Sequence, residues 1–212
     1  MEKEIVLLPL CVCLDVSSNN TDPDYIQKLS SAVETFYKSA MNHRILNGNI
    51  DIAVITFASD IKVEEDFTMV KDKKKPQLAI RSGKQNLNDA IRKGLELLKK
   101  RKERYRECGI DYYNAHLFVF LGKDAHKLDK GLAKEIHDLI MNHKLSSFCI
   151  PMDKSIEEEQ LNDISPRYCC FKHELENKEF VTDLAFPEDD ITPDFSSDEP
   201  ISKDYSKDLL DL

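Results

Sequence analysis

The sequence lacks the patterns that mark the common membrane and enzyme classes. No apolar run approaches the roughly 20 residues of a membrane-spanning helix. No serine stands in a Gly-x-Ser-x-Gly turn, and Ser82-Gly83-Lys84 has no upstream glycine of a phosphate loop. The six histidines are scattered without a metal-binding spacing. We therefore expect no membrane segment and no hydrolase, phosphate-loop or histidine-metal centre.

Cysteine occurs six times, but never as a Cys-x-x-Cys pair. Neither a spaced disulfide framework nor a zinc site is indicated, and Met1-Glu2-Lys3-Glu4 is not the basic start of a secretory leader. We therefore expect reduced thiols and a cytoplasmic location.

Negative charge is concentrated at the C-terminal end. Residues 187–212 hold nine acidic and two basic residues, a net of 2 − 9 = −7 out of the chain's −9. Such a segment buries too little apolar surface to fold alone, so we predict a folded domain over 1–186 and a flexible acidic tail over 187–212. Hydroxyl residues among the carboxylates are candidate phosphorylation sites, although such tails are more often only solubilising. The candidates are Thr192, Ser196, Ser197, Ser202 and Ser206.

Strand and helix patterns alternate along the rest of the chain. Apolar runs predict strands, and apolar residues at helical spacing predict helices between them. The fold class is therefore α/β, with a doubly wound, mostly parallel sheet and one antiparallel edge strand in a hairpin over 61–67. The predicted strands are 5–14, 50–58, 117–121, 148–152 and 168–171, and the predicted helices are 22–43, 87–106, 132–140, 156–164 and 177–186.

The first predicted strand ends in Asp15-Val16-Ser17-Ser18-Asn19, an Asp-x-Ser-x-Asn pattern. Ligands of open α/β sheets bind beyond the carboxyl ends of the strands, and alternate residues of an extended turn can point oxygens at one cation. The pattern therefore predicts a metal site, with a simple turn and helix cap as the alternative.

Six motifs follow one another along the chain in a fixed order. They are Leu14-Asp15-Val16-Ser17-Ser18-Asn19, Val54-Ile55-Thr56-Phe57-Ala58, Asn86-Leu87-Asn88-Asp89-Ala90-Ile91, Arg101-Lys102-Glu103-Arg104-Tyr105-Arg106, Leu117-Phe118-Val119-Phe120-Leu121 and Leu161-Asn162-Asp163-Ile164-Ser165-Pro166-Arg167. Their order and spacing resemble those of the von Willebrand factor A domain family, in its bacterial tellurium-resistance type. The resemblance covers roughly residues 3 to 186 and excludes the acidic tail.

The resemblance implies a metal-ion-dependent adhesion site with five protein positions. Asp15, Ser17 and Asn19 match the first three, with Asn19 where a serine is usual, and Gln85 takes the place of a threonine. The fifth position, an aspartate in the family, aligns with Lys123. An ammonium there would repel a divalent cation and pair with Asp15, which predicts a degenerate, metal-free site. A one-residue shift would instead bring in Asp124 and leave a Mg²⁺ site.

The resemblance implies a non-enzymatic adaptor in a bacterial signalling, stress-response or anti-phage defence system. Its expected protein partners are a serine/threonine kinase, a metal-dependent phosphatase or a defence effector. A partner side chain, such as an acidic one, would enter the crevice around Asp15, Ser17, Gln85 and Lys123. One alternative is a Mg²⁺-dependent, adhesion-type ligand binder. Another is a nucleic-acid-binding domain that uses the basic run 99–106, although basic residues are favoured at a helix end anyway.

Overall fold

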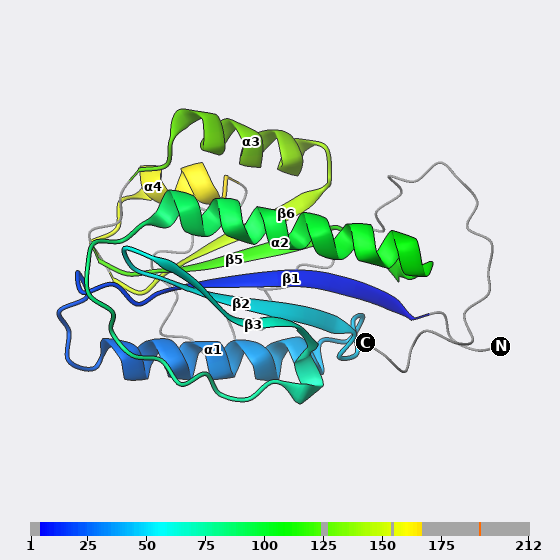
Figure 1. Cartoon of the computed structure of the whole chain (residues 1–212), viewed down its shortest axis with the longest axis horizontal. Helices are drawn as coiled ribbons and strands as arrows, with labels where there is room; N and C mark the ends of the chain where they lie inside the picture. Colours follow the sequence, from blue (N-terminus) through cyan, green and yellow to red (C-terminus); the bar gives the residue numbers. More distant parts are fainter. Residues whose placement is uncertain (1–4, 124–126, 154, 167–190, 192–212) are drawn as a thin grey trace.

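The computed structural model describes residues 5–123, 127–153, 155–166 and 191 (Figure 1). Strands and helices alternate through these residues, as the apolar pattern predicts. In chain order they are β1 (Val6–Asp15), α1 (Tyr25–Asn42), β2 (Ile50–Phe57), β3 (Ile61–Met69), the 3-10 turn η1 (Val70–Asp72), α2 (Leu87–Cys108), β4 (Asp111–Tyr112), β5 (Ala115–Leu121), α3 (Lys130–Met141), β6 (Leu145–Pro151) and α4 (Glu158–Ile164).

The strands form one mixed sheet in the order β3-β2-β1-β5-β6, and the short β4 also pairs with β1. All described neighbours are parallel except β2 and β3, which form the antiparallel edge. The α/β class with one antiparallel edge strand is therefore confirmed. Because β1 lies between β2 and β5, the carboxyl ends of these three parallel strands meet at one edge of the sheet.

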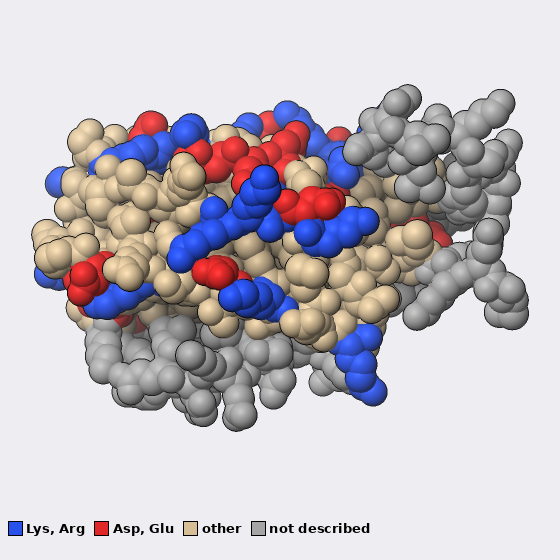
Figure 2. Space-filling model, turned by 90° about the horizontal axis from the view of Figure 1, so that it is seen from below, with Lys and Arg blue, Asp and Glu red and all other residues tan. Residues whose placement is uncertain are grey.

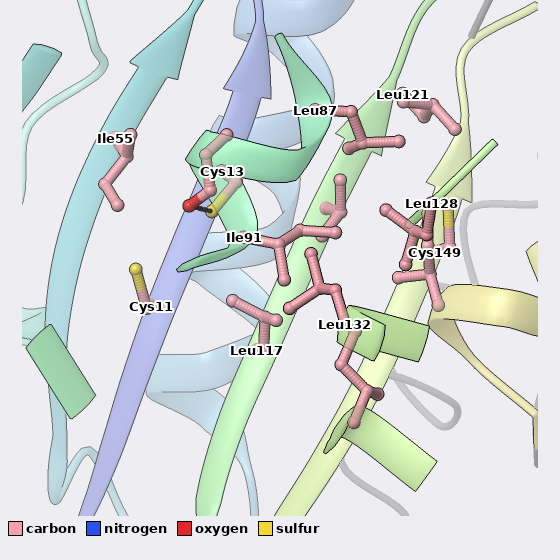
Figure 3. Close-up of a cluster of buried hydrophobic side chains, with 14 of the residues drawn as sticks. Cys11, Cys13, Ile55, Leu87, Ile91, Leu117, Leu121, Leu128, Leu132 and Cys149 are labelled. Carbon is pink, nitrogen blue, oxygen red and sulfur yellow. Dashed lines mark hydrogen bonds between the residues drawn. The ribbon is translucent and has the colours of Figure 1, made fainter. Parts of the chain in front are cut away.

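Helices cover both faces of the sheet, and each face has its own apolar layer (Figure 1). On one face α2, α3 and α4 pack on Cys11, Cys13 and their neighbours (Figure 3). Helix α2 comes close to β1 because residue 94 is glycine: a Cβ there would lie 3.0 Å from Leu117 Cδ1 and 3.4 Å from the Sγ of both Cys11 and Cys13. On the other face α1 packs through Phe36 on aromatic side chains of β5.

Element boundaries differ from the sequence prediction at a few places. Strand β6 begins three residues earlier than predicted, because Ser146 and Ser147 are polar residues buried within it. Helix α1 begins at Tyr25 rather than near Asp22, whose side chain and carbonyl accept hydrogen bonds from the residues that precede the helix and open it. The strand predicted over 168–171 and the helix predicted over 177–186 lie outside the described residues. None of the described helices is long and apolar enough to cross a membrane.

Candidate functional site

Asp15 is the last residue of β1, and its side chain is fully buried at the carboxyl edge of the sheet. The neighbouring strand β5 ends at Leu121, so Gly122 and Lys123 follow directly beside Asp15. Ser17, two residues beyond Asp15, is also fully buried, and Gln85 reaches the same place from the loop before α2. The structure thus brings Asp15, Ser17 and Gln85 together, as the sequence predicts.

Three protein donors satisfy the Asp15 carboxylate. The Ser17 backbone N–H donates to Oδ1 at 2.9 Å. The Gln85 side-chain amide donates to Oδ2 at 2.5 Å, and the Gly122 backbone N–H donates to the same oxygen at 3.0 Å. Hydrogen bonds to a charged acceptor are among the stronger ones in proteins, and a buried carboxylate needs such partners to remain charged. Both oxygens are therefore occupied by donors from the chain itself.

The loop before α2 holds Gln85 over Asp15 because backbone hydrogen bonds fix it on both sides. The Arg81 N–H donates to the Val16 carbonyl at 2.8 Å, beside a short parallel bridge between residues 17 and 81. The Asn86 N–H donates to the Ala58 carbonyl, also at 2.8 Å. The loop is thus attached to the end of β1 and to the end of β2. Gln85 lies one residue from the second attachment, and only 4% of it is exposed.

Asn20 is a member of the site that the sequence analysis missed. Its amide Nδ2 donates to the Ser17 carbonyl at 3.2 Å, and its Oδ1 accepts from the Lys123 N–H at 2.8 Å. Asn19, the predicted ligand, is half-buried and is not part of these bonds. A Cβ on Gly122 would lie 2.1 Å from Asn20 Oδ1, so this close approach requires glycine. The Asn20 amide therefore joins the ends of β1 and β5.

Lys123 contributes its backbone rather than its charge to this network. Its side chain is exposed, and among the described residues no ion pair joins it to Asp15. Hydrogen bonds from the side chain and the backbone N–H of Ser155 lower the pKa of Asp153, and the positive charge of Lys123 lowers it further. The ion pair expected between Lys123 and Asp15 is thus replaced by the Gln85 and Gly122 donors. Asp124, the alternative fifth ligand, lies outside the described residues.

Tyr25 closes the site from the start of α1. Its hydroxyl donates to the Asp15 carbonyl at 2.8 Å. Burial raises the pKa of Tyr25 far above its ordinary value, and the negative charges of Asp15 and Asp153 raise it further. The phenol is therefore neutral at physiological pH and acts as a donor that positions the end of β1.

Three basic residues in the C-terminal part of α2 pair with carboxylates of this chain. The Arg101 Nε donates to Oδ2 of the buried Asp51 at 2.6 Å, and the Tyr105 hydroxyl donates to the same oxygen at 2.5 Å. Lys100 pairs with Glu96 and Arg104 with Glu107 along the helix surface. Arg101 therefore holds α2 against the start of β2, and two of its basic neighbours are neutralised by carboxylates of the same helix.

Within the described residues, no group of three or more histidine, cysteine, aspartate or glutamate side chains is placed to hold a metal ion. Of the cysteines that the structure describes, Cys11, Cys13 and Cys108 are free thiols. A hydrogen bond with Cys13 and burial raise the pKa of the Cys11 thiol well above its ordinary value, so it is not a reactive thiolate. The five hydroxyl residues predicted as phosphorylation sites in the tail lie outside the described residues.

The fold is similar to those of several solved structures, of which three are described here. The fold matches the crystal structure of the SpRpn10 VWA domain with a TM-score of 0.52 and 17% identity, over 69% of this chain and 75% of that one. It also matches proximal thread matrix protein 1 (PTMP1) from the mussel byssus with a TM-score of 0.56 and 15% identity, over 86% of this chain and 48% of that one. A PTMP1 structure with a zinc-occupied MIDAS motif matches with a TM-score of 0.53 and 16% identity, over 85% and 46%.

This chain therefore spans just under half of each of these PTMP1 chains, and at such identities the likeness shows the shared fold alone. Comparison with curated protein sequences gave no significant match. The profile of the von Willebrand factor type A domain, however, matches residues 10–185, which run from the middle of β1 to beyond α4. Because this match covers most of the chain and agrees with the sheet order and with Asp15 at the end of β1, the chain belongs to the von Willebrand factor type A (VWA) domain family.

Proposed function

We propose that this protein is a non-enzymatic interaction adaptor whose strand-end site works without a divalent cation. VWA domains are in general protein-interaction modules, often with a metal-ion-dependent adhesion site (MIDAS). The observation that carries the proposal is the full set of donors around Asp15. Three N–H groups of this chain occupy the carboxylate where a metal-dependent member would present its oxygens to a cation.

The donor chemistry of the described residues does not fit a divalent cation. Mg²⁺ takes oxygen ligands in a nearly ideal octahedron. Gln85 instead points amide hydrogens at Asp15, and Gly122 contributes a backbone N–H. The Lys123 ammonium is the exposed charge beside them. Gln85 and Gly122 thereby supply the positive end of a dipole at the place that a cation would fill.

Asp15, Ser17 and Gln85 are buried, so a partner would contact the exposed residues at the rim of the site. Lys84 and Lys123 are exposed on the two loops that close over Asp15, and Ser18 is exposed between them in the chain turn after β1. Two ammonium groups and a hydroxyl on one edge suit an acidic or phosphorylated side chain. We infer a partner of that chemistry, within a bacterial signalling, stress-response or defence system that includes a serine/threonine kinase or a metal-dependent phosphatase.

Metal dependence is tested by calorimetry and thermal unfolding of the full chain with Mg²⁺ and with EDTA. The expected result is no heat of binding and the same melting temperature (Tm) in both conditions. A Gln85→Thr, Lys123→Asp double variant should gain a Tm increase with Mg²⁺, because it restores the two altered family positions. Tight Mg²⁺ binding by the natural chain would contradict the proposal.

The adaptor role is tested by binding of the chain to an acidic peptide that carries phosphoserine, the partner chemistry inferred above, with Mg²⁺ and with EDTA. Binding should be equal in both buffers and weaker for Lys123→Glu. Lys144→Glu is the matched control, because Lys144 is also exposed but directly precedes β6, away from the carboxyl ends of the strands. Equal loss in both variants would show general charge attraction rather than use of this rim.

A Mg²⁺-dependent ligand binder is the second candidate, and the zinc-occupied MIDAS of PTMP1 is the observation that favours it. In this chain that function would require Gln85 to leave Asp15. Partner binding that EDTA abolishes would therefore support this second candidate.

A further inference from the structure

The connection between α1 and β2 turns on Asn47-Gly48, the only Asn-Gly pair in the sequence. Both residues have positive φ angles, 47° for Asn47 and 78° for Gly48. The Asn49 N–H donates across them to the Leu46 carbonyl at 2.8 Å. A hydrogen bond from residue i+3 to residue i around two left-handed residues is the pattern of a type I′ turn, for which Asn-Gly is a preferred sequence. The turn therefore places an asparagine directly before a glycine.

Two groups of this turn can react with each other: the side-chain amide of Asn47 and the backbone nitrogen of Gly48. Asn47 is exposed, and within the described part of the chain its side-chain amide has no hydrogen-bond partner. The Gly48 N–H likewise has no acceptor among those residues. A Cβ on Gly48 would meet only the Met41 carbonyl, at 4.0 Å. Neither reacting group is therefore held or covered by its described surroundings.

We propose that Asn47 is a site of spontaneous deamidation, and that its isoaspartate product loosens the start of the β1–β2 pair. The Gly48 nitrogen loses its proton to base and attacks Cγ of Asn47. The new C–N bond closes a five-membered cyclic imide as the Cγ–Nδ2 bond breaks, and ammonia leaves with a proton returned by the solvent. Water then opens the ring. Cleavage at Cγ gives aspartate, and cleavage at the main-chain carbonyl carbon gives isoaspartate, so one water is consumed and one ammonia released.

The residue after each asparagine decides how easily this attack occurs. Gly48 has no Cβ, so the approach to its nitrogen is open and its backbone can leave the left-handed conformation when the turn opens. Asn49 is followed instead by Ile50, whose branched and fully buried side chain crowds its own nitrogen. Asn49 is also fixed through both of its backbone groups, by Leu46 and by Leu8. Asn49 is therefore an internal comparison that lies two residues from the proposed site.

Isoaspartate at residue 47 would change the chain path at the amino end of β2. The main chain would run through Cβ and Cγ, so the turn would gain one main-chain carbon and a free carboxylate. Directly after the turn, the Asn49 carbonyl accepts from the Leu8 N–H at 3.0 Å, where the parallel pairing of β1 with β2 begins. Leu46, only 1% exposed, holds the other side of the turn in the apolar layer under α1. A longer turn between these two fixed points therefore disturbs the first β1–β2 contacts.

The added charge is the smaller part of the change. On the side of the molecule that carries α1, lysine and arginine side chains lie among carboxylates and do not form a surface of one sign (Figure 2). Lys28 pairs with Asp22 there, and Lys38 pairs with Glu34. One more carboxylate joins a surface that is already mixed in sign. We therefore expect the longer backbone, rather than the charge, to produce the structural effect.

The test incubates the full chain at neutral and at alkaline pH and maps its peptides by mass spectrometry, which distinguishes asparagine, aspartate and isoaspartate at each position. Conversion at Asn47 should approach the rate in a synthetic peptide of residues 42–52, should rise with pH because the attacking nitrogen must lose a proton, and should exceed conversion at Asn49. Hydroxylamine, which cleaves cyclic imides, should cut the chain between residues 47 and 48. An isoaspartate methyltransferase should transfer methyl groups from S-adenosylmethionine to the incubated chain and not to incubated Asn47→Gln.

The structural effect is measured on the incubated chain by thermal unfolding and by hydrogen exchange of peptides that cover residues 5–10 and 44–52. Isoaspartate should lower the Tm and speed exchange in both peptides. Asn47→Asp, which adds the charge on an ordinary backbone, is the matched control and should keep the natural values.

Two results would overturn the proposal. An intact amide at Asn47, under conditions that convert the synthetic peptide, would show that the folded turn protects it. Isoaspartate at residue 47 with natural Tm and exchange would show that the longer turn does not reach the β1–β2 pair. Neither result bears on the candidate site around Asp15, which lies at the opposite, carboxyl end of these strands.

Discussion

The hydrogen bond between Gln85 and Asp15 can be removed with little change in shape by Gln85→Leu. The substitution leaves the buried Asp15 Oδ2 with the Gly122 N–H as its only described donor. Hydrogen bonds to charged groups contribute about 1.5–3 kcal/mol, so we expect a loss of about 2 kcal/mol in the free energy of unfolding. For a domain of this size such a loss lowers the Tm by about 4–8 °C.

Urea and thermal unfolding, followed by circular dichroism, measure this loss. Gln77→Leu is the matched control, because Gln77 lies in the same connection between η1 and α2 but is exposed, and its Tm should be unchanged. A double-mutant cycle with Asp15→Asn isolates the pair: the cost of Gln85→Leu should fall markedly once residue 15 is uncharged. A Gln85→Leu protein as stable as the natural one would refute the reasoning that Gln85 replaces a cation.

Three further changes test other contacts. Gly122→Ala should lower the free energy of unfolding by about 1–3 kcal/mol, and with it the Tm, since its Cβ would lie 2.1 Å from Asn20 Oδ1. Gly131→Ala in α3, whose Cβ would meet nothing within 4 Å, should be neutral or stabilising in the same thermal assay. Arg101→Leu should cost about 3 kcal/mol in urea unfolding, because it takes an ionic partner from the buried Asp51; an unchanged midpoint would show that the pair adds no stability. The raised pKa values of three buried tyrosines mean that the folded state retains their protons. Stability is therefore full below the ordinary tyrosine pKa of about 10 and falls as the pH rises above it, so phenolate absorbance of these residues should appear only with unfolding. These tyrosines are Tyr25, Tyr37 and Tyr105.

The sequence predicted the architecture wherever a side-chain pattern reports directly on burial. The run through β1 is apolar on both faces because both faces are covered, and Asn86 at the start of α2 accepts from the Asp89 N–H as a helix cap does. The start of β6 gave no such signal. Its Ser146 hydroxyl accepts from Asn114, and this partner across the strand pair makes a buried serine acceptable.

The sequence predicted part of the candidate site, because some of its residues stand at positions that the family pattern marks. Asp15, Ser17 and Gln85 stand at recognisable positions of the family pattern, and the structure brings them together. Asn20, and not Asn19, joins the strand ends because of the backbone path of the turn. The side-chain types in the sequence do not specify that path. Likewise, alignment with the family pattern places Lys123 beside Asp15. It does not show whether Lys123 contributes its backbone N–H or its side-chain ammonium group to the site.

The central position of β1 has a consequence for synthesis on the ribosome. The first strand made pairs with β2 and, through Leu10–Leu14, with residues 116–120 of β5, which are made more than a hundred residues later. After β2 and β3 emerge, the other edge of β1 therefore has no described strand partner until β4 and β5 are made. An unpaired strand edge with apolar side chains is the kind of surface on which nascent chains aggregate. We expect nascent chains that end between β3 and β5 to depend most on chaperones, and α2, made in that interval, to shield one apolar face of β1 before its partner strand arrives.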